Sequence, residues 1–152
     1  MHIWVDADAC PVVIKDILFR AAQRWKRPLT LVANQMLYTP PSLLIRAVQV
    51  PRGFDVADDY IVLHAGVGDL VVTGDIPLAA QLIDKEAFVL SHRGELFSVD
   101  NIRERLSIRD MMEELRSAGV ETGGPAAFSQ SDQRGFANAL DRLMMKLSQT
   151  AS

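Results

Sequence analysis

Short apolar runs alternate along this chain with longer segments in which apolar residues recur every three or four positions. The runs have the length and β-branched content of buried strands, and the longer segments have the period of amphipathic helices. Predicted strands cover 2–5, 29–33, 69–73 and 87–90. Predicted helices cover 11–25, 55–64, 76–83, 101–117 and 132–147, the last one capped by Asp132. The segment 43–50 is predicted to be a short helix that runs into a further strand.

Alternation of this kind restricts the fold, because a helix between strands carries the chain back across the sheet and lets the next strand pair in parallel. The chain has 152 residues, of which 49% are hydrophobic and 23% charged, as in an ordinary globular protein. We therefore predict a single α/β domain over 1–152, with three layers and a mainly parallel central sheet flanked by helices. A Gly- and Ser-rich connector is expected at 119–131 and a frayed tail at 148–152.

Cysteine content and hydropathy indicate where the protein works. Cys10 is the single cysteine, so an intrachain disulfide is excluded. The first residues lack the layout of a signal peptide, and no apolar run approaches the ~18 residues of a membrane span. We expect a cytoplasmic protein without a membrane partner. A net charge of -3 argues against a general coat for nucleic acid, although Arg103, Arg105 and Arg109 form a local basic cluster that a solvated helix face also explains.

Carboxylates follow the predicted strands at the points where these end. Asp6 ends the first apolar run, Asp8 lies two residues further on, and Asp75 follows the run Leu70–Gly74. The carboxyl ends of parallel strands meet at one edge of a sheet, where ligands of such folds bind. Clustered carboxylates repel unless a cation, a shared proton or arginines offset their charge. The pattern predicts a site for Mg²⁺ or Mn²⁺, ions that prefer oxygen ligands.

Helix termini offer a competing explanation for part of this set. Asp58 and Asp59 open a predicted helix, where the helix dipole favours carboxylates without any function, and they are included here as further metal ligands. Capping also accounts for Asp8 and Asp75, each of which precedes a helix. Neither effect explains why Asp6 ends a strand.

Further candidates lie outside the acidic set. Cys10 precedes a helix whose dipole would favour a thiolate, but His2, His64 and His92 fall on unrelated elements and none is placed as its base. His92 and Arg93 are expected to meet a substrate phosphate. The loop Gly123-Gly124-Pro125 and the segment 129–134 either wrap back to the strand ends, bringing Asp132 and Arg134, or form a plain linker.

Several motifs resemble the YaiI/YqxD family of uncharacterised bacterial proteins over nearly the whole chain. They are Val5-Asp6-Ala7-Asp8-Ala9-Cys10-Pro11, Val32-Ala33-Asn34, Gly53-Phe54-Asp55-Val56-Ala57-Asp58-Asp59, Val72-Thr73-Gly74-Asp75-Ile76-Pro77-Leu78-Ala79, Ser91-His92-Arg93-Gly94, Asn101-Ile102 and Gly123-Gly124-Pro125 with Asp132 and Arg134. That family looks like a member of the PIN-like superfamily, whose nucleases hold Mg²⁺ or Mn²⁺ with acidic residues at strand ends.

The resemblance implies a metal-dependent nuclease that hydrolyses phosphodiester bonds, with RNA as the expected substrate. Asp6 would correspond to the acid of the first strand, Asp58 or Asp59 to the acid that opens the middle helix, and Asp75 to the acid after the fourth strand. Asp6, Asp8 and Asp75 are the predicted catalytic residues. The predicted metal ligands are Asp6, Asp8, Asp58, Asp59 and Asp75. The predicted substrate-binding residues are Asn34, Arg52, His92, Arg93, Asp132 and Arg134.

Other function classes remain open at this stage. Asp6-Ala7-Asp8 after a hydrophobic strand also resembles the nucleophile and acid of haloacid-dehalogenase-type phosphatases, but Cys10 stands where those enzymes usually have Thr or Val. A non-catalytic module of the same fold that binds RNA or protein is the remaining alternative. The sequence carries no signal for an oligomeric state.

Overall fold

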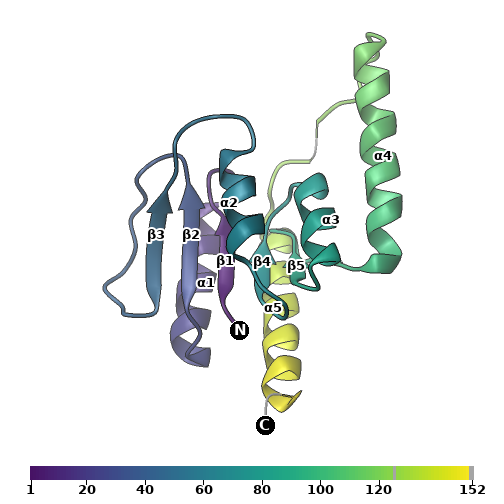
Figure 1. The fold of residues 1–152 in the computed structure, drawn as a ribbon. Coiled ribbons are helices and arrows are strands. Elements are labelled where there is room, and N and C mark those ends of the chain that lie inside the picture. The colour runs from purple at the N-terminus through teal and green to yellow at the C-terminus, as the bar shows by residue number, and fades with distance from the viewer. Residues whose placement is uncertain (125, 151–152) are drawn as a thin grey trace.

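In the computed structural model, which describes residues 1–124 and 126–150, the described strands form one six-stranded sheet in the order β3-β2-β1-β4-β5-β6 (Figure 1). The strands are β1 (Ile3–Asp6), β2 (Leu29–Ala33), β3 (Ile45–Gln49), β4 (Leu70–Val72), β5 (Phe88–Leu90) and β6 (Leu96–Phe97). The helices are α1 (Val12–Trp25), α2 (Val56–His64), α3 (Ile76–Asp84), α4 (Val99–Ser117) and α5 (Gln130–Thr150).

Neighbouring strands pair in parallel except β5 and β6, which form an antiparallel pair. Val5 in the central strand β1 is in register with Leu31 of β2 on one side and Val72 of β4 on the other. The chain proceeds outward from β1 through β2 and β3, then returns to the other side of β1 as β4. The pair β1 and β4 is therefore the topological switch point, beyond which parallel α/β sheets bind their ligands.

Helices cover both faces of the sheet (Figure 1). One core layer packs Ile14 and Leu18 of α1 and Phe136 and Leu140 of α5 against the sheet. The opposite layer contains residues of α2, α3 and α4, among them Ile61, Leu82 and Ile102. β1, β2 and β4 are buried from both faces, apart from the half-buried Asp6 at the end of β1, which explains why their sequences are continuous apolar runs. The predicted three-layer α/β architecture with a mainly parallel sheet is confirmed, and it is consistent with a PIN-like domain.

The region of the sheet differs from its prediction in two places. The hairpin partner β6 was not predicted, since Leu96–Phe97 is too short to give a period. No helix precedes β3: the Ser42 hydroxyl accepts a hydrogen bond from the Leu44 N–H at 3.1 Å, and the Leu44 carbonyl pairs with the Leu29 N–H at 2.7 Å. Three residues between a proline pair and a strand are too few to nucleate a helix.

The last helix also differs from its prediction at both ends. α5 begins at Gln130, and Ser129 rather than Asp132 occupies the cap: the Ser129 hydroxyl accepts from the Asp132 N–H at 3.2 Å, and the Asp132 carboxylate accepts from the Ser129 N–H at 3.0 Å. This reciprocal pair is a capping box. Leu147 packs on the core, and the helix continues through Ser148 to Thr150, into the tail predicted at 148–152; residues 151–152 lie outside the described residues.

The start of α5 is fixed to the β5–β6 turn by a contact between glycine backbones. Gly94 has φ +91°, and a Cβ atom there would lie 2.5 Å from the carbonyl carbon and oxygen of Gly135. Only glycine permits both this backbone conformation and this approach. The segment before α5 therefore returns to the carboxyl edge of the sheet. Pro125, in the predicted Gly-rich loop, lies outside the described residues.

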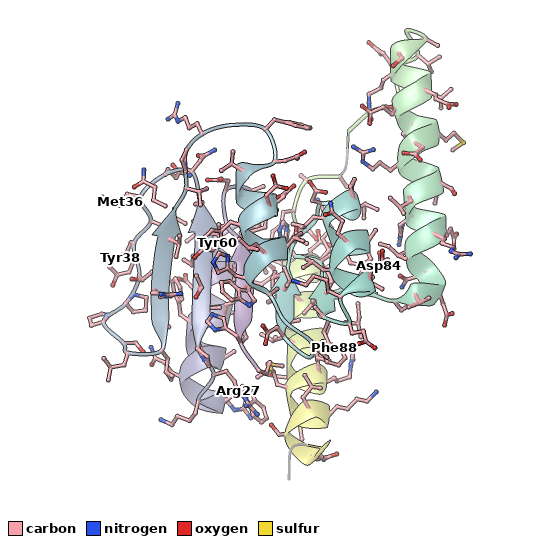
Figure 2. All side chains as sticks on the ribbon, in the orientation of Figure 1. Arg27, Met36, Tyr38, Tyr60, Asp84 and Phe88 are labelled. Atoms are coloured by element: carbon pink, nitrogen blue, oxygen red, sulfur yellow. The ribbon has the colours of Figure 1, made fainter. Side chains whose placement is uncertain are left out.

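Surface features complete the architecture. Met36 and Tyr38 are exposed by 86% and 80% and project from the segment that joins β2 to β3 (Figure 2).

At the amino-terminal edge, His2 stacks on Trp4 with centroids 4.1 Å apart, and the Trp4 indole N–H donates to the Asp69 carboxylate at 3.1 Å. None of the described helices is long and apolar enough to cross a membrane.

Candidate active site at the carboxyl edge of the sheet

The hydroxyl of Thr73 connects Asp6 and Asp75, the acids that end β1 and precede α3. Thr73 is fully buried; its hydroxyl donates to Asp6 Oδ2 at 2.9 Å and accepts from the Asp75 N–H at 3.0 Å. Asp75 Oδ1 in turn accepts from the Leu78 N–H at 3.0 Å and caps α3. The predicted capping role of Asp75 is thus correct, and one oxygen of each carboxylate is fixed by the protein.

The first turn of α2 brings further carboxylates to the same place. Asp55, Asp58, Asp59 and Asp75 line a cavity of about 230 Å³, which Arg109 of α4 also borders. The turn into α2 is tight: Asp55 adopts the left-handed conformation, with φ 63°, and makes no side-chain cap. The preceding side chain of Phe54 is 94% exposed at the rim of the cavity. The structure therefore brings Asp58 and Asp59 to the edge where β1 and β4 end.

Burial and mutual repulsion perturb the protonation of these acids. Burial raises the pKa of Asp58 to about 7, with further increases from the charges of Asp75, Asp6, Asp55 and Asp59. Burial also raises the pKa of Asp6, an effect opposed by the Thr73 hydrogen bond and reinforced by Asp75 and Asp8. None of these carboxylates forms an ion pair with Lys or Arg among the described residues. The charge of the cluster is left without a basic partner.

Asp8 occupies a different setting from the other acids. It is exposed, and both of its oxygens accept from the Asn34 N–H, at 3.1 and 2.9 Å. It does not cap α1, whose first turn has no side-chain cap. The structure thus brings Asp8 and Asn34 together, joining the loops that follow β1 and β2. Arg52, predicted to contact substrate, is exposed in the turn before α2.

The carboxylates are neighbours, but they do not form a finished ligand sphere. Within the part of the chain that the structure describes, no three His, Cys, Asp or Glu side chains are gathered as a metal site would gather them. Asp6 Oδ1 and Asp75 Oδ2 nevertheless have no hydrogen-bond partner among the described residues, so one oxygen of each remains for a ligand.

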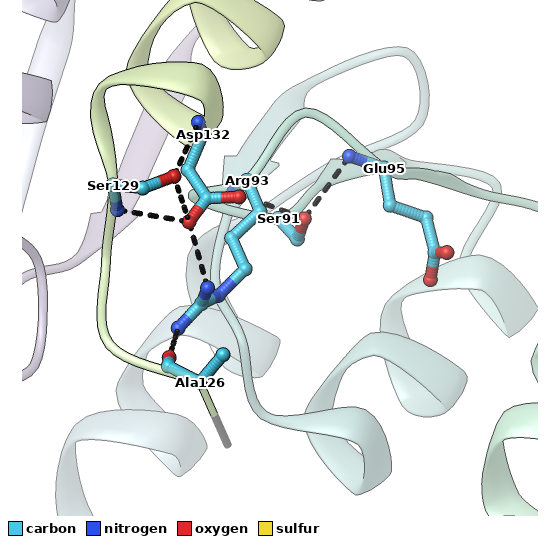
Figure 3. Close-up of polar contacts among 6 residues, drawn as sticks. All are labelled: Ser91, Arg93, Glu95, Ala126, Ser129 and Asp132. Carbon is cyan, nitrogen blue, oxygen red and sulfur yellow. Dashed lines mark hydrogen bonds and ion pairs between the residues drawn. The ribbon is translucent and has the colours of Figure 1, made fainter.

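Arg93, in the β5–β6 turn, is held by the start of α5 (Figure 3). Its Nη1 donates to Asp132 Oδ2 at 2.7 Å, its Nη2 donates to the Ala126 carbonyl, and the guanidinium lies 5.9 Å from the centroid of the Phe128 ring. Hydrogen bonds from Ser129 and the Arg93 guanidinium hold the pKa of Asp132 below its usual range. The structure thus brings Arg93 and Asp132 together, whereas Arg134 is exposed on the next turn of α5.

The cysteine and the histidines do not form a nucleophilic centre. Burial raises the pKa of the Cys10 thiol to about 12, so that it stays protonated at neutral pH. His2 bonds to the Thr30 hydroxyl at 2.7 Å, and His64 bonds to the Tyr60 carbonyl at 2.8 Å. Burial and the charge of Arg93 lower the pKa of His92, whose ring lies beside Gly74 at the edge of the sheet. A thiolate mechanism has no support here.

The sequence did not single out several residues of this edge. Thr73 was assigned only to a strand, although a hydroxyl between a buried strand and an Asp-initiated helix is a signal that could have identified it. Phe54 and Glu95 were missed because their roles depend on which loops and helices are neighbours. Arg105 and Arg109 were noted only within a basic cluster.

The architecture defines the class first: an α/β domain with an acidic crevice at the switch point of a parallel sheet. The chain belongs to the YaiI/YqxD family, because the family model described as "Uncharacterized BCR, YaiI/YqxD family" matches residues 4–146.

Relatives from several bacteria match over nearly their full length. The UPF0178 protein Bpet3884 of Bordetella petrii is 81% identical over 145 residues, covering 95% of this chain and 97% of that protein. The UPF0178 protein BAV3236 of Bordetella avium is 72% identical over 152 residues, covering 100% and 99%. A UPF0178 protein of Dechloromonas aromatica is 62% identical over 147 residues, covering 97% and 98%. No solved structure matches this chain.

Proposed function

We propose that this protein is a Mg²⁺- or Mn²⁺-dependent nuclease that hydrolyses phosphodiester bonds in RNA. The observation that carries the proposal is the convergence of Asp6, Asp58 and Asp75 at the switch point, where burial and mutual repulsion raise the pKa of Asp58 to about 7. Packing does not require such a cluster, because each acid opposes the ionisation of its neighbours. A cation at this edge would remove the repulsion.

The donor set suits a hard divalent cation. All the candidate ligands are carboxylate oxygens, which Mg²⁺ and Mn²⁺ prefer over softer ions. Asp6 Oδ1 and Asp75 Oδ2 are the best-placed donors, because Thr73 and the Leu78 N–H already fix the opposite oxygen of each. Asp58 and Asp59 would complete the set from α2. Asp8 would join from the loop after β1, because the one Asn34 N–H that its oxygens share leaves lone pairs for a cation.

Such an ion supplies Lewis acidity toward water and a phosphoryl oxygen. The residues of this chain orient the carboxylates and stabilise the charge on the phosphate. Thr73 orients Asp6, the helix cap orients Asp75, and the Arg93 guanidinium, fixed by Asp132, offsets negative charge that develops on the phosphate. Arg52, exposed in the turn before α2, and Arg109, which borders the acidic cavity, are further candidate cations. RNA as the substrate follows from the resemblance to PIN-like nucleases.

The contacts of Asp8 rank the phosphatase alternative second. In that mechanism Asp6 would attack the phosphoryl group and Asp8 would act as the acid. Asp8 is instead held against the loop after β2, because its two oxygens share one hydrogen bond from the Asn34 N–H. An aspartyl-phosphate trapped during turnover would restore that alternative.

The test is a calorimetric titration of Mn²⁺ and Mg²⁺ into the wild type and into Asp6→Asn and Asp75→Asn. Asparagine still caps a helix, so Asp75→Asn retains the local structure of α3. Asp84→Asn, at the exposed end of the same helix, is the matched control. We expect metal binding in the wild type and the control, and loss of binding in both site variants.

Cleavage assays on single-stranded RNA and DNA accompany the titration. Metal-dependent cleavage by the wild type and the control, lost in both site variants, supports the nuclease. A wild type that binds neither ion refutes the metal site and returns the carboxylates to capping roles. Metal-dependent binding of RNA without any product would identify a non-catalytic binding module.

A further inference from the structure

A second cavity lies at the carboxyl edge, on the far side of Asp75 from the acidic one. Its volume is about 390 Å³, within the range of small-ligand sites. Gly74 and Ile76 line it on either side of Asp75, the β5–β6 turn supplies most of the remaining wall, and Arg105 of α4 closes it. Because Asp75 itself borders the acidic cavity, the two cavities adjoin the same turn before α3.

The walls of this cavity combine cations, hydrogen-bonding groups and an apolar floor. Phe97 and Ile76 supply the apolar surface. Arg93 is fixed by Asp132 and the Ala126 carbonyl. Among the described residues Arg105 is paired with Glu95 alone, and the side chains of that pair are partly exposed, by 44% and 33%. Arg105 is therefore the cation that can turn toward a ligand. Guanidinium groups bind phosphate through two parallel hydrogen bonds.

Two polar groups in the wall have unused hydrogen-bonding capacity. The Ser91 hydroxyl accepts from the Arg93 N–H at 3.3 Å and from the Glu95 N–H at 3.0 Å, which leaves its own hydrogen to donate. The Nε2 atom of His92 is buried and has no partner among the described residues. Buried polar atoms in native folds are nearly always paired, if not by the protein then by water or a ligand.

We propose that this cavity binds one nucleotide of a single-stranded nucleic acid, with Arg105 on its phosphate and its base between the Phe97 floor and the hydrogen-bonding groups of the β5–β6 turn. The inference rests on the proposed function in placing the adjacent phosphodiester at Asp75. A phosphate alone would leave the apolar floor of Phe97 and Ile76 uncovered. A single-stranded nucleic acid that enters this cavity would pass the turn that contains Asp75 and so reach the acidic cavity. Phe54 is exposed at the rim of the acidic cavity, where its ring would stack on the neighbouring base.

The experiment measures binding of the four ribonucleoside 5′-monophosphates to the metal-free protein in excess EDTA, by calorimetry and by amide chemical shifts. We expect Arg105→Ala to weaken binding about tenfold or more, the effect of losing charge-assisted hydrogen bonds. Arg105→Lys should retain part of the affinity. The matched control is Arg103→Ala, which removes an exposed arginine from the same helix without touching the cavity. In the wild type, the amides of Gly74 and Gly94 should shift on titration, while Gly119, at the end of α4, should not.

The outcomes separate this inference from the proposed function. Nucleotide binding at Gly74 and Gly94 in EDTA, without cleavage of any nucleic acid under metal, supports the pocket and refutes the nuclease. The opposite result is metal-dependent cleavage together with equal effects of Arg105→Ala and Arg103→Ala on nucleotide binding and no amide shift at Gly74 or Gly94. That result refutes the nucleotide pocket but supports the nuclease. Inorganic phosphate that binds as tightly as the mononucleotides would also overturn the nucleotide assignment.

Discussion

Replacing Asp58 by asparagine is expected to stabilise the metal-free protein above neutral pH. Asn has nearly the shape of Asp but carries no charge, so Asp58→Asn removes the repulsion from Asp75, Asp6, Asp55 and Asp59 without opening a cavity. Burial and those neighbours raise the pKa of the folded protein's Asp58 from an ordinary value of 3.8 to about 7. The folded state therefore holds this proton more tightly than the unfolded state does.

The sign and size of the effect follow from proton linkage. A raised pKa contributes stability that is fully present below 3.8 and is lost as the pH rises through about 7. Each pH unit in that window corresponds to about 1.4 kcal/mol at most, or about 4 kcal/mol in all. The Asp58 side chain is partly exposed and solvent screens its charge, so we expect about 1 to 2 kcal/mol. The variant should exceed the wild type by this amount at pH 8 and match it near pH 4.

Urea unfolding at both pH values, in excess EDTA, measures the difference. Asp59→Asn is the matched control, because its exposed side chain occupies the same first turn of α2 and loses the same favourable interaction with the helix dipole. Equal stability of Asp58→Asn and Asp59→Asn at pH 8 would refute the reasoning. Added Mg²⁺ should reverse the ranking, since an ion that binds only the folded wild type stabilises it by about 2.7 kcal/mol at a hundred times its Kd.

Other substitutions test the contacts that position the site. Gly94→Ala places a Cβ atom 2.5 Å from the Gly135 backbone at φ +91° and should cost about 2 to 3 kcal/mol in urea unfolding; a loss below about 0.5 kcal/mol would contradict the close approach. Thr73→Val should cost about 1 to 3 kcal/mol and weaken Mn²⁺ binding in calorimetry, whereas Thr73→Ser keeps the hydroxyl and should retain Mn²⁺ binding, at a cost of about 1 kcal/mol for the lost buried methyl group. Asp69→Ala should cost about 1 to 2 kcal/mol at pH 7. Burial would raise the pKa of Asp69, but hydrogen bonds from Gly66, His2 and Trp4 outweigh it and lower the pKa, so thermal scans should show the stability difference shrinking as the pH falls. An unchanged stability difference at pH 3 would count against this hydrogen-bond network.

The sheet and its helices were predictable because periodicity is a local property. β1, β2 and β4 are buried on both faces and are continuous apolar runs, and α3 begins at an Asp followed by a Pro in its first turn. The order of the strands then places Asp6 and Asp75 at one edge. Where local signals were short, the prediction failed, as for β6 and for the turn before β3.

The ion pairs that α4, the β5–β6 turn and the start of α5 contribute at this edge were not predictable in the same way. Arg105 meets Glu95 across the gap between α4 and the β5–β6 turn, and Arg93 meets Asp132 over 39 positions of sequence. Such pairs depend on how helices pack, which no period in the sequence encodes. These charged residues lie in the sequence among other exposed charged residues, so composition does not show which of them form pairs.

The acids of this edge differ in what they do for folding, and that difference bears on function. Asp75 caps α3 and Asp8 joins two loops, so each would be expected in a purely structural protein. Asp58 has no such contact; it makes no cap and no ion pair among the described residues, and its neighbours oppose its charge. A partly buried carboxylate whose burial and neighbours oppose its charge by more than the helix dipole favours it is typical of functional sites. The Asp58→Asn measurement therefore also tests whether this carboxylate costs stability in the metal-free protein, as a residue retained for a ligand would.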